Sequence, residues 1–476
     1  MIPAAARHEL VSWLGAQRCL DKPEDLTLYE YDGGVDKAKP EMVVFPRSTE
    51  EVVKIVNITR AHGIPLVGRG AGTGLSGGAI PRAGGVIVSF ARMNRILEID
   101  LINERMVVQP GVVNLDMSLA VQGDKYFYAP DPSSQRACTI GGNVSENAGG
   151  PHTLAYGVTT NHVVGLEMVL MDGRVVETGG KMTDLPGYDV AGLFTGSEGT
   201  MVLVTKVIVR LMRQPEAVKT ILAIYDRASD CGLTVAEMMR QAITPVAVEM
   251  LDGVMLRMVE EATHAGFPMD AEAVLLIELE GVIEQVEEQV EQIRQVCLAS
   301  KAREFRVAKS AEERELLWKG RKNAFGAVGR VSPNYYVQDG VVPRTKIEPA
   351  LAHIRKVADK YGLLISNIFH AGDGNLHPII LFNQYKDGDL EKAKKAGDEI
   401  LEFCIEAGGS ITGEHGVGME KTELMDRQFP PVTLDMIGHF KSLFDPECRL
   451  NPGKVLPVGR GCMEIRQPPL TAANAL

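Results

Sequence analysis

The chain has 476 residues, which is too long for one ordinary domain and predicts two or three. Its 50 Lys and Arg residues against 62 Asp and Glu residues give a formal net charge of -12, which argues against nucleic acid or an anionic membrane as the main ligand. The 7 cysteines are scattered without a CxxC pair, which predicts reduced thiols in the cytoplasm and excludes an iron–sulfur cluster on a Cys-rich run of this chain.

The first half of the chain predicts a mixture of helices and strands. Residues 1–20 lack the pattern of a signal peptide. Residues 48–51 (STEE) are typical of a capping box at the start of a helix that ends near Gly63. The expected strands cover residues 64–67, 85–90, 105–109 and 201–211, with a hairpin over residues 163–178 that turns at Asp172 and Gly173.

The pattern changes near residue 213, where long amphipathic helices begin to alternate with strands. Strands are expected over residues 220–225 and 273–281, and helices over residues 283–298 and 311–330. This alternation predicts a separate α+β domain. A helix is expected over residues 424–444 and a loose tail over residues 458–476. No stretch of about 18 apolar residues occurs, so we expect no transmembrane segment.

A glycine-rich loop over residues 68–78 contains the GxGxxG pattern from Gly72 to Gly77. The pattern alone is a weak signal, and a Rossmann site requires a helix directly after the glycines. Pro81, Gly84 and Gly85 prevent such a helix. Two interpretations stay open: a turn whose backbone N–H groups wrap a pyrophosphate, or a long flexible turn.

Small hydroxyl, amide and glycine residues gather in two further segments, residues 129–150 and residues 196–200. Ordering such segments without a ligand is entropically costly. They favour a buried polar cofactor that accepts and donates many hydrogen bonds.

In order and spacing, the three segments resemble the FAD-binding half of flavoproteins of the vanillyl-alcohol-oxidase type, the type 4 FAD-binding fold, over residues 40–211. This resemblance implies a two-subdomain FAD-binding domain. Some members bind flavin covalently through a His in the first loop; residues 68–78 contain no His, which implies non-covalent FAD. The FAD contacts implied by the resemblance are Arg69, Gly70, Gly72, Thr73, Gly74, Leu75, Pro130, Ser133, Thr139, Gly142, Asn143, Asn147, Gly149, Gly150, Glu198 and Asn451.

Three of the 10 histidines lie in two glycine-rich segments, residues 370–377 (HAGDGNLH) and residues 413–418 (GEHGVG). Two histidines and a carboxylate are a reasonable ligand set for Zn²⁺, Mn²⁺ or Fe²⁺. A histidine beside a glycine is more often structural, so the residues alone leave both a metal site and a structural role open.

These two segments resemble the C-terminal half of D-2-hydroxy acid dehydrogenases, and residues 10–457 are similar above all to the flavin subunits of bacterial glycolate oxidases. The resemblance implies that His370, His377 and Glu414 hold a divalent metal. It also implies that His415 is the catalytic base and that Arg321 pairs with the substrate carboxylate. Phe325 and Gln338 stand where the 2-hydroxyglutarate enzymes have a Thr and a Lys, which disfavours a dicarboxylate substrate.

The resemblance implies that a small D-2-hydroxy acid, glycolate or D-lactate, is oxidised to the 2-oxo acid by hydride transfer to FAD. It also implies an iron–sulfur subunit and a second flavin-fold subunit that pass electrons to a respiratory acceptor, with the chain in the cytoplasm or held at the inner membrane by these partners. Three alternatives remain: a D-lactate dehydrogenase acting alone, a non-redox transferase resembling alkylglycerone phosphate synthase, and a silent scaffold subunit.

The expected division of the chain follows from the same resemblance. Residues 1–212 form the FAD-binding domain and residues 213–412 form an α+β substrate or cap domain. Residues 413–457 form a partly helical C-terminal segment that returns to the flavin.

Overall fold

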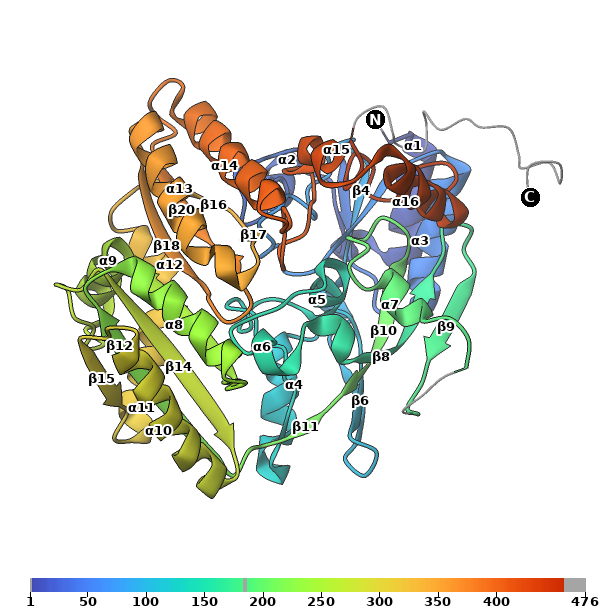
Figure 1. The fold of residues 1–476 in the computed structure, drawn as a ribbon. Helices are drawn as coiled ribbons and strands as arrows, with labels where there is room; N and C mark the ends of the chain where they lie inside the picture. The colour runs from blue at the N-terminus through green and yellow to red at the C-terminus, as the bar shows by residue number, and fades with distance from the viewer. Residues whose placement is uncertain (1, 183–185, 458–476) are drawn as a thin grey trace.

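The computed structural model describes residues 2–182 and 186–457, so the expected tail over residues 458–476 lies outside the described residues. Figure 1 shows two adjoining halves, the first coloured blue to green and the second yellow-green to orange, with the red C-terminal segment lying back against the first half. The expected mixture of helices and sheets is confirmed. Within the described residues, no helix has both the length and the apolar character needed to cross a membrane.

The first sheet is small and mostly parallel. Its strands, in spatial order, are β1 (Cys19–Leu20), β2 (Met42–Val44), β4 (Val86–Ser89) and β3 (Leu66–Arg69). Helices α1 (Ala4–Leu14) and α3 (Thr49–Ala61) bury their apolar faces in the same core as this sheet. The Ser48 side chain accepts a hydrogen bond from Glu51 N at 3.4 Å, so α3 begins where the capping pattern predicts. Helix α1 was not expected from the sequence.

The second sheet is antiparallel throughout. Its strands, in spatial order, are β5 (Ile96–Asp100), β6 (Arg105–Val108), β10 (Leu203–Arg210), β8 (Val163–Val169) and β9 (Val175–Gly179). The hairpin of β8 and β9 confirms the prediction, with Gly173 in the turn at a φ of 88°. Helices α4 (Asn114–Val121), α5 (Ile140–Glu146) and α7 (Val190–Phe194) contribute to its core.

The third sheet forms the centre of the second half. Its main path runs through β15 (Glu304–Val307), β12 (Ala217–Tyr225), β14 (Ala273–Gly281), β13 (Ala247–Asp252), β18 (Leu364–His370), β19 (Asn375–Leu376) and β17 (Gly340–Val341). Strand β20 (Pro378–Phe382) pairs with β18, and β16 (Asn334–Val337) pairs with β20.

Helices cover both faces of this sheet. One face packs against α8 (Ala228–Arg240), α10 (Ile283–Ala299), α13 (Ile347–Tyr361) and α14 (Asp389–Glu406). The other face packs against α9 (Gly253–Thr263), α11 (Ala311–Lys322) and α12 (Ala324–Val328). The single helix expected over residues 311–330 was therefore wrong, because Asn323 leaves the helical region at φ -95° and ψ 10°. This break places Arg321 in the last turn of α11.

The C-terminal segment crosses from the second half back to the first. Its helices are α15 (Met425–Gln428) and α16 (Pro431–Phe444). The single helix expected over residues 424–444 was wrong as well. Phe429 has an extended backbone, and Pro430 has no N–H group to donate to the helical hydrogen bonds. Beyond α16 the chain pairs with β3, since Leu66 N donates to Arg449 O at 2.8 Å and Asn451 N donates to Leu66 O at 2.7 Å.

Short elements complete the description. They are α2 (Pro23–Leu26), α6 (Thr153–Tyr156), the pair β7 (Tyr126–Phe127) and β11 (Met212–Arg213), and 3-10 turns at Ala16–Arg18, Thr27–Tyr29, Phe90–Arg92, Gln122–Asp124, Thr159–Asn161, Arg344–Lys346 and Thr422–Leu424.

Candidate active site

A cavity of about 610 Å³ lies where the two halves meet. Residues of the glycine-rich loop, of residues 132–148 and of residues 198–204 line it from the first half, together with residues of the second half and of the C-terminal segment. The predicted site residues in the lining are Arg69, Gly70, Gly72, Thr73, Gly74, Leu75, Ser133, Thr139, Gly142, Asn143, Glu198, Arg321, His377, Glu414 and His415. The cavity therefore brings together both groups of residues that the sequence singled out.

The other predicted residues, Pro130, Asn147, Gly149, Gly150, His370 and Asn451, lie outside this lining. Asn451 supports the wall, since its Nδ2 donates to Gly78 O and Glu198 O, both at 2.9 Å. Gly149 packs against Glu414, where a Cβ would come within 2.8 Å of Oε2.

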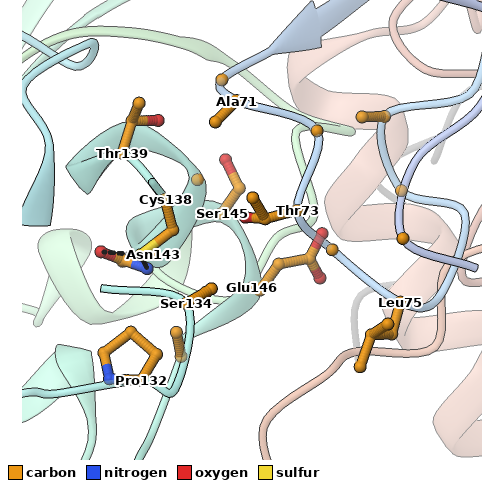
Figure 2. Close-up of a pocket in the computed structure, with 18 of the residues that line it drawn as sticks. Ala71, Thr73, Leu75, Pro132, Ser134, Cys138, Thr139, Asn143, Ser145 and Glu146 are labelled. Carbon is orange, nitrogen blue, oxygen red and sulfur yellow. Dashed lines mark hydrogen bonds between the residues drawn. The ribbon is translucent and has the colours of Figure 1, made fainter. Parts of the chain in front are cut away.

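The glycine-rich loop closely approaches the segment opposite it. Figure 2 shows Ala71, Thr73 and Leu75 on one side of the cavity and Pro132, Ser134 and Thr139 on the other. Gly72 has a φ of 70°, and a Cβ on it would collide with the Arg69 guanidinium. Arg69 donates from Nη2 to Tyr31 O at 2.8 Å, so its side chain joins the loop to the N-terminal part of the chain.

Buried polar atoms in the cavity wall lack partners. Among the described residues, Thr139 Oγ1 and Glu146 Oε2 are buried without a hydrogen-bond partner, and both residues line the cavity. Burial, and then the neighbouring Glu198 carboxylate, raises the pKa of Glu146 well above its ordinary value. Unpaired buried oxygens are costly, and a protonated carboxyl and a hydroxyl group can each donate or accept, so these two atoms fit a bound group rich in hydrogen-bonding atoms, as FAD is.

Three imidazoles surround one carboxylate oxygen at the other end of the cavity. Glu414 Oε1 lies 3.1 Å from His377 Nε2, 3.3 Å from His370 Nε2 and 3.9 Å from His415 Nε2. His370 and His377 each have Nδ1 anchored elsewhere, to Glu249 Oε1 at 2.6 Å and to Gln338 O at 3.3 Å. Their Nε2 atoms therefore converge on Glu414, a donor set that fits a divalent metal.

Asp339 holds the loop that carries Glu414 and His415. Its fully buried carboxylate accepts hydrogen bonds from Thr412 Oγ1 at 2.5 Å, from Gly413 N at 2.9 Å, from Glu414 N at 3.1 Å and from His415 N at 2.9 Å. Burial would raise the pKa of Asp339, but the positive charge of neighbouring groups holds it below its ordinary value. Asp339 therefore fixes the backbone from which the side chains of Glu414 and His415 project.

Arg321 already has a partner within the protein. Its Nε and Nη2 both lie 2.6 Å from Glu249 Oε2, and the pair is almost completely buried. Burial opposes charge on Glu249, but Arg321 and His370 hold the pKa of Glu249 below its ordinary value. Any anion that entered the cavity beside Arg321 would therefore meet a guanidinium whose Nε side is already bonded.

Sequence reasoning missed Glu249 and Asp339 as site residues. Glu249 stands among apolar residues in 246–251 (VAVEML), and Asp339 follows Gln338 in residues 337–342 (VQDGVV), where the other residues are Val and Gly. Asp and Glu are almost never fully buried unless paired, so the available signals were a lone carboxylate within β13 and another in the short link between β16 and β17.

The fold and the cavity define a protein that binds a dinucleotide-sized cofactor beside a histidine and carboxylate centre. Residues 40–179 match the family model described as FAD binding domain, and residues 214–455 match the model described as FAD linked oxidases, C-terminal domain. The chain belongs to the FAD-linked oxidases.

Curated relatives extend the match along nearly the whole chain. The glycolate oxidase subunit GlcD of Escherichia coli K12 is 44% identical over 447 residues, covering 94% of this chain and 90% of that protein. The subunit GlcD of Bacillus subtilis 168 is 40% identical over 457 residues, covering 96% and 97%. A D-lactate dehydrogenase of Anaerostipes hadrus is 32% identical over 428 residues, covering 88% and 90%.

Solved structures support the fold. A p-cresol methylhydroxylase with substrate bound superposes with a TM-score of 0.81 at 19% identity, covering 96% of this chain and 97% of that chain. At this identity the likeness extends to the fold alone.

Proposed function

We propose that this chain oxidises a small D-2-hydroxy monocarboxylate, glycolate or D-lactate, to the 2-oxo acid with FAD as cofactor. The observation that carries the proposal is that Arg321, His415 and the oxygen of Glu414 face the same cavity as the glycine-rich loop. The relatives named as glycolate oxidase subunits and as D-lactate dehydrogenase support the same chemistry.

FAD would lie along the glycine-rich loop and the segment around Thr139 and Glu146. When bound, it supplies the acceptor for the hydride that leaves C2 of the substrate. The attachment is non-covalent, since no His occurs in residues 68–78.

A divalent metal, Zn²⁺, Mn²⁺ or Fe²⁺, would be held by His370, His377 and Glu414. When bound, it supplies a Lewis acid beside the substrate oxygens. The inward-facing Nε2 atoms and the anchored Nδ1 atoms of the two histidines support this ligand set.

The protein residues perform the remaining steps. Arg321 binds the substrate carboxylate by a charge-assisted hydrogen bond and so orients C2. His415 accepts the proton of the 2-hydroxyl group; burial lowers the pKa of His415 to about 4, which leaves its ring neutral near pH 7. Loss of this proton and of the hydride from C2 converts the alcohol into a carbonyl group.

The charge of the site favours a monocarboxylate. Lys322, which also lines the cavity, lies 3.6 Å from Asp131 Oδ2, and Arg321 is paired with Glu249. A second substrate carboxylate would have to compete with one of these carboxylates. Phe325 and Tyr335 line the same region with stacked rings, which offers no positive charge.

The division of the chain and its partners belong to the proposal too. Residues 1–212 would bind FAD, residues 213–412 would cover the substrate and residues 413–457 would complete the site. As the relatives' names indicate a subunit, we propose an iron–sulfur partner and a second flavin-fold partner, with the chain in the cytoplasm or attached through them to the inner membrane.

An anaerobic spectrum of the purified protein tests the reaction. Glycolate or D-lactate should bleach the flavin absorption, while L-lactate should not and D-2-hydroxyglutarate should act more slowly. The ratio of the first two rates assigns the substrate. Failure of all four acids to reduce the flavin would reject the proposal in favour of a transferase or a scaffold subunit.

A further inference from the structure

Glu249 lies between Arg321, the proposed partner of the substrate carboxylate, and His370, a proposed metal ligand. On one side its Oε2 accepts hydrogen bonds from Arg321 Nε and Nη2, both at 2.6 Å. On the other side its Oε1 accepts from His370 Nδ1 at 2.6 Å. The Glu249 side chain is completely buried, so these two partners, and no bulk water, compensate its charge.

The sheet explains why this contact is fixed. Glu249 in β13 is directly opposite His370 in β18, and the two strands are antiparallel. Facing residues of adjacent strands project to the same face of a sheet. Helix α11 covers that face and brings Arg321 onto it. Strand register and helix packing therefore fix all three side chains.

Each contact has a chemical consequence. In the neutral ring that binds a metal, a proton on Nδ1 donated to Glu249 leaves the lone pair on Nε2, the nitrogen that faces Glu414. Because Nε and Nη2 of Arg321 are bonded to one carboxylate oxygen, the Nη1 end of the guanidinium is left to meet an anion in the cavity.

We propose that Glu249 is a positioning residue that couples the metal site to the site of the substrate carboxylate. It orients His370 for the metal and Arg321 for the anion through its two oxygens. This inference rests on the proposed function, because the metal and the substrate are part of that proposal.

Glu249→Gln is the variant that tests the coupling. An amide presents one oxygen and one NH₂, so one of the two contacts becomes donor against donor and the other loses its charge assistance. Both sites should weaken. Glu278→Gln is the matched control: Glu278 lies in the neighbouring strand β14, is 1% exposed and is bonded to Trp318 Nε1 and Arg314 Nε, but it contacts neither His370 nor Arg321 in the described structure.

Two binding measurements test the metal site and the site of the substrate carboxylate without requiring catalytic turnover. Metal per chain is determined after dialysis against a graded series of chelator, and pyruvate is titrated at saturating metal while the flavin spectrum is recorded. In Glu249→Gln the metal affinity should fall about 10- to 100-fold, the usual effect of removing an outer-shell partner. The dissociation constant for pyruvate should rise at least threefold, while FAD content stays as in the wild type. Glu278→Gln should lower the melting temperature and change neither affinity.

The outcomes separate this inference from the proposed function. If only one affinity changes, or neither, Glu249 does not couple the sites. If Glu278→Gln weakens both affinities equally, the effect is general destabilisation. If Glu249→Gln loses FAD, Glu249→Asp replaces it as the test variant. Its carboxylate keeps the charge but is shorter by one methylene group, so both contacts should still weaken. The same two affinities, for metal and for pyruvate, then decide whether Glu249 couples the sites. A wild-type protein that neither binds pyruvate nor is reduced by any 2-hydroxy acid would instead reject the proposed function.

Discussion

The imidazole rings of His377 and His415 are stacked, with centroids 5.0 Å apart and planes inclined by 8°. Their Nε2 atoms lie at different distances from Glu414 Oε1, 3.1 Å for His377 and 3.9 Å for His415. The ring nearer to the carboxylate is suited to hold a metal with it, and the more distant ring is suited to receive a proton.

His415 and Glu414, although adjacent, should therefore fail in different ways when replaced. His415→Ala should retain FAD and metal and lose on the order of 100-fold or more in the single-turnover rate of flavin reduction. Glu414→Ala should lower the metal content. Metal analysis and stopped-flow reduction of both variants provide the comparison. If His415→Ala lost its metal but reduced flavin normally once metal was resupplied, His415 would be a ligand and the base would lie elsewhere.

Arg321→Lys should impair the site although it keeps the charge. Arg321 binds Glu249 through Nε and Nη2, which leaves Nη1 for an anion. A lysine ammonium lacks this planar fork and cannot serve both partners in the same way. We expect kcat/KM to fall about 30-fold, equivalent to about 2 kcal/mol. Arg314→Lys on the same helix is the control: the half-buried Arg314 pairs with Glu278 and does not line the cavity, so kcat/KM should stay nearly unchanged. A loss below about threefold in Arg321→Lys would assign the substrate anion to another cation.

Removal of the metal should separate catalysis from flavin binding. About one divalent ion per chain is expected by elemental analysis. A chelator should abolish most of the turnover while the visible flavin spectrum stays nearly constant, and restored metal should recover activity. Full turnover in a metal-free sample would leave His370, His377 and Glu414 as direct substrate contacts.

The flavin should be released by acid. Precipitation of the yellow protein should leave FAD in the supernatant, because residues 68–78 contain no histidine for covalent attachment. Absorption at about 450 nm, read in both fractions, decides the point. Flavin that remains with the pellet would mean that another residue forms a covalent bond.

His152 in the first half of the chain contacts Glu278 in the second half, and this contact predicts that stability depends on pH. Burial would lower the pKa of His152, but Asp131, at 2.9 Å, and Glu278, at 3.2 Å, raise it to about 10. The folded pKa is higher than the unfolded pKa of about 6.5, so this stabilisation is complete below pH 6.5 and is lost as the pH rises through 10. The difference in melting temperature between wild type and His152→Gln should be greatest near pH 6 and shrink toward pH 10. A difference that does not change with pH would mean that His152 acts without its charge.

The sequence predicted the parts of the site that lie in short contiguous motifs. The loop of residues 68–78 and the segments around His370 and Glu414 carry their chemistry in local spacing, and they line or adjoin the cavity. Glu249 was missed because its role depends on a partner 121 residues away in another strand. The apolar residues around Glu249 indicate a buried carboxylate, but strand register and helix packing decide its partners, and these leave no local pattern.

The ends of helices α11 and α15 were also not predictable from the local sequence pattern. Apolar periodicity continues through Asn323 and through Phe429, yet the backbone leaves the helix at both residues. Conversely, Gly141 and Gly142 lie inside α5 despite their low helix propensity. Gly141 is required there, because a Cβ would collide with Pro110.

The return of the chain to its own beginning sets an order of assembly. Met419 N donates to Ser76 O at 3.0 Å, Gly418 N donates to Glu198 at 2.6 Å, and Asn451 joins Gly78 to Glu198. The segment of residues 413–457 therefore closes over a loop that is synthesised well before it. Stable capture of the cofactor should therefore wait until residues 413–457 have been made, and exchange of bound flavin should require this closing segment to detach. Amide hydrogen exchange at Gly418 should accordingly keep pace with the release of FAD.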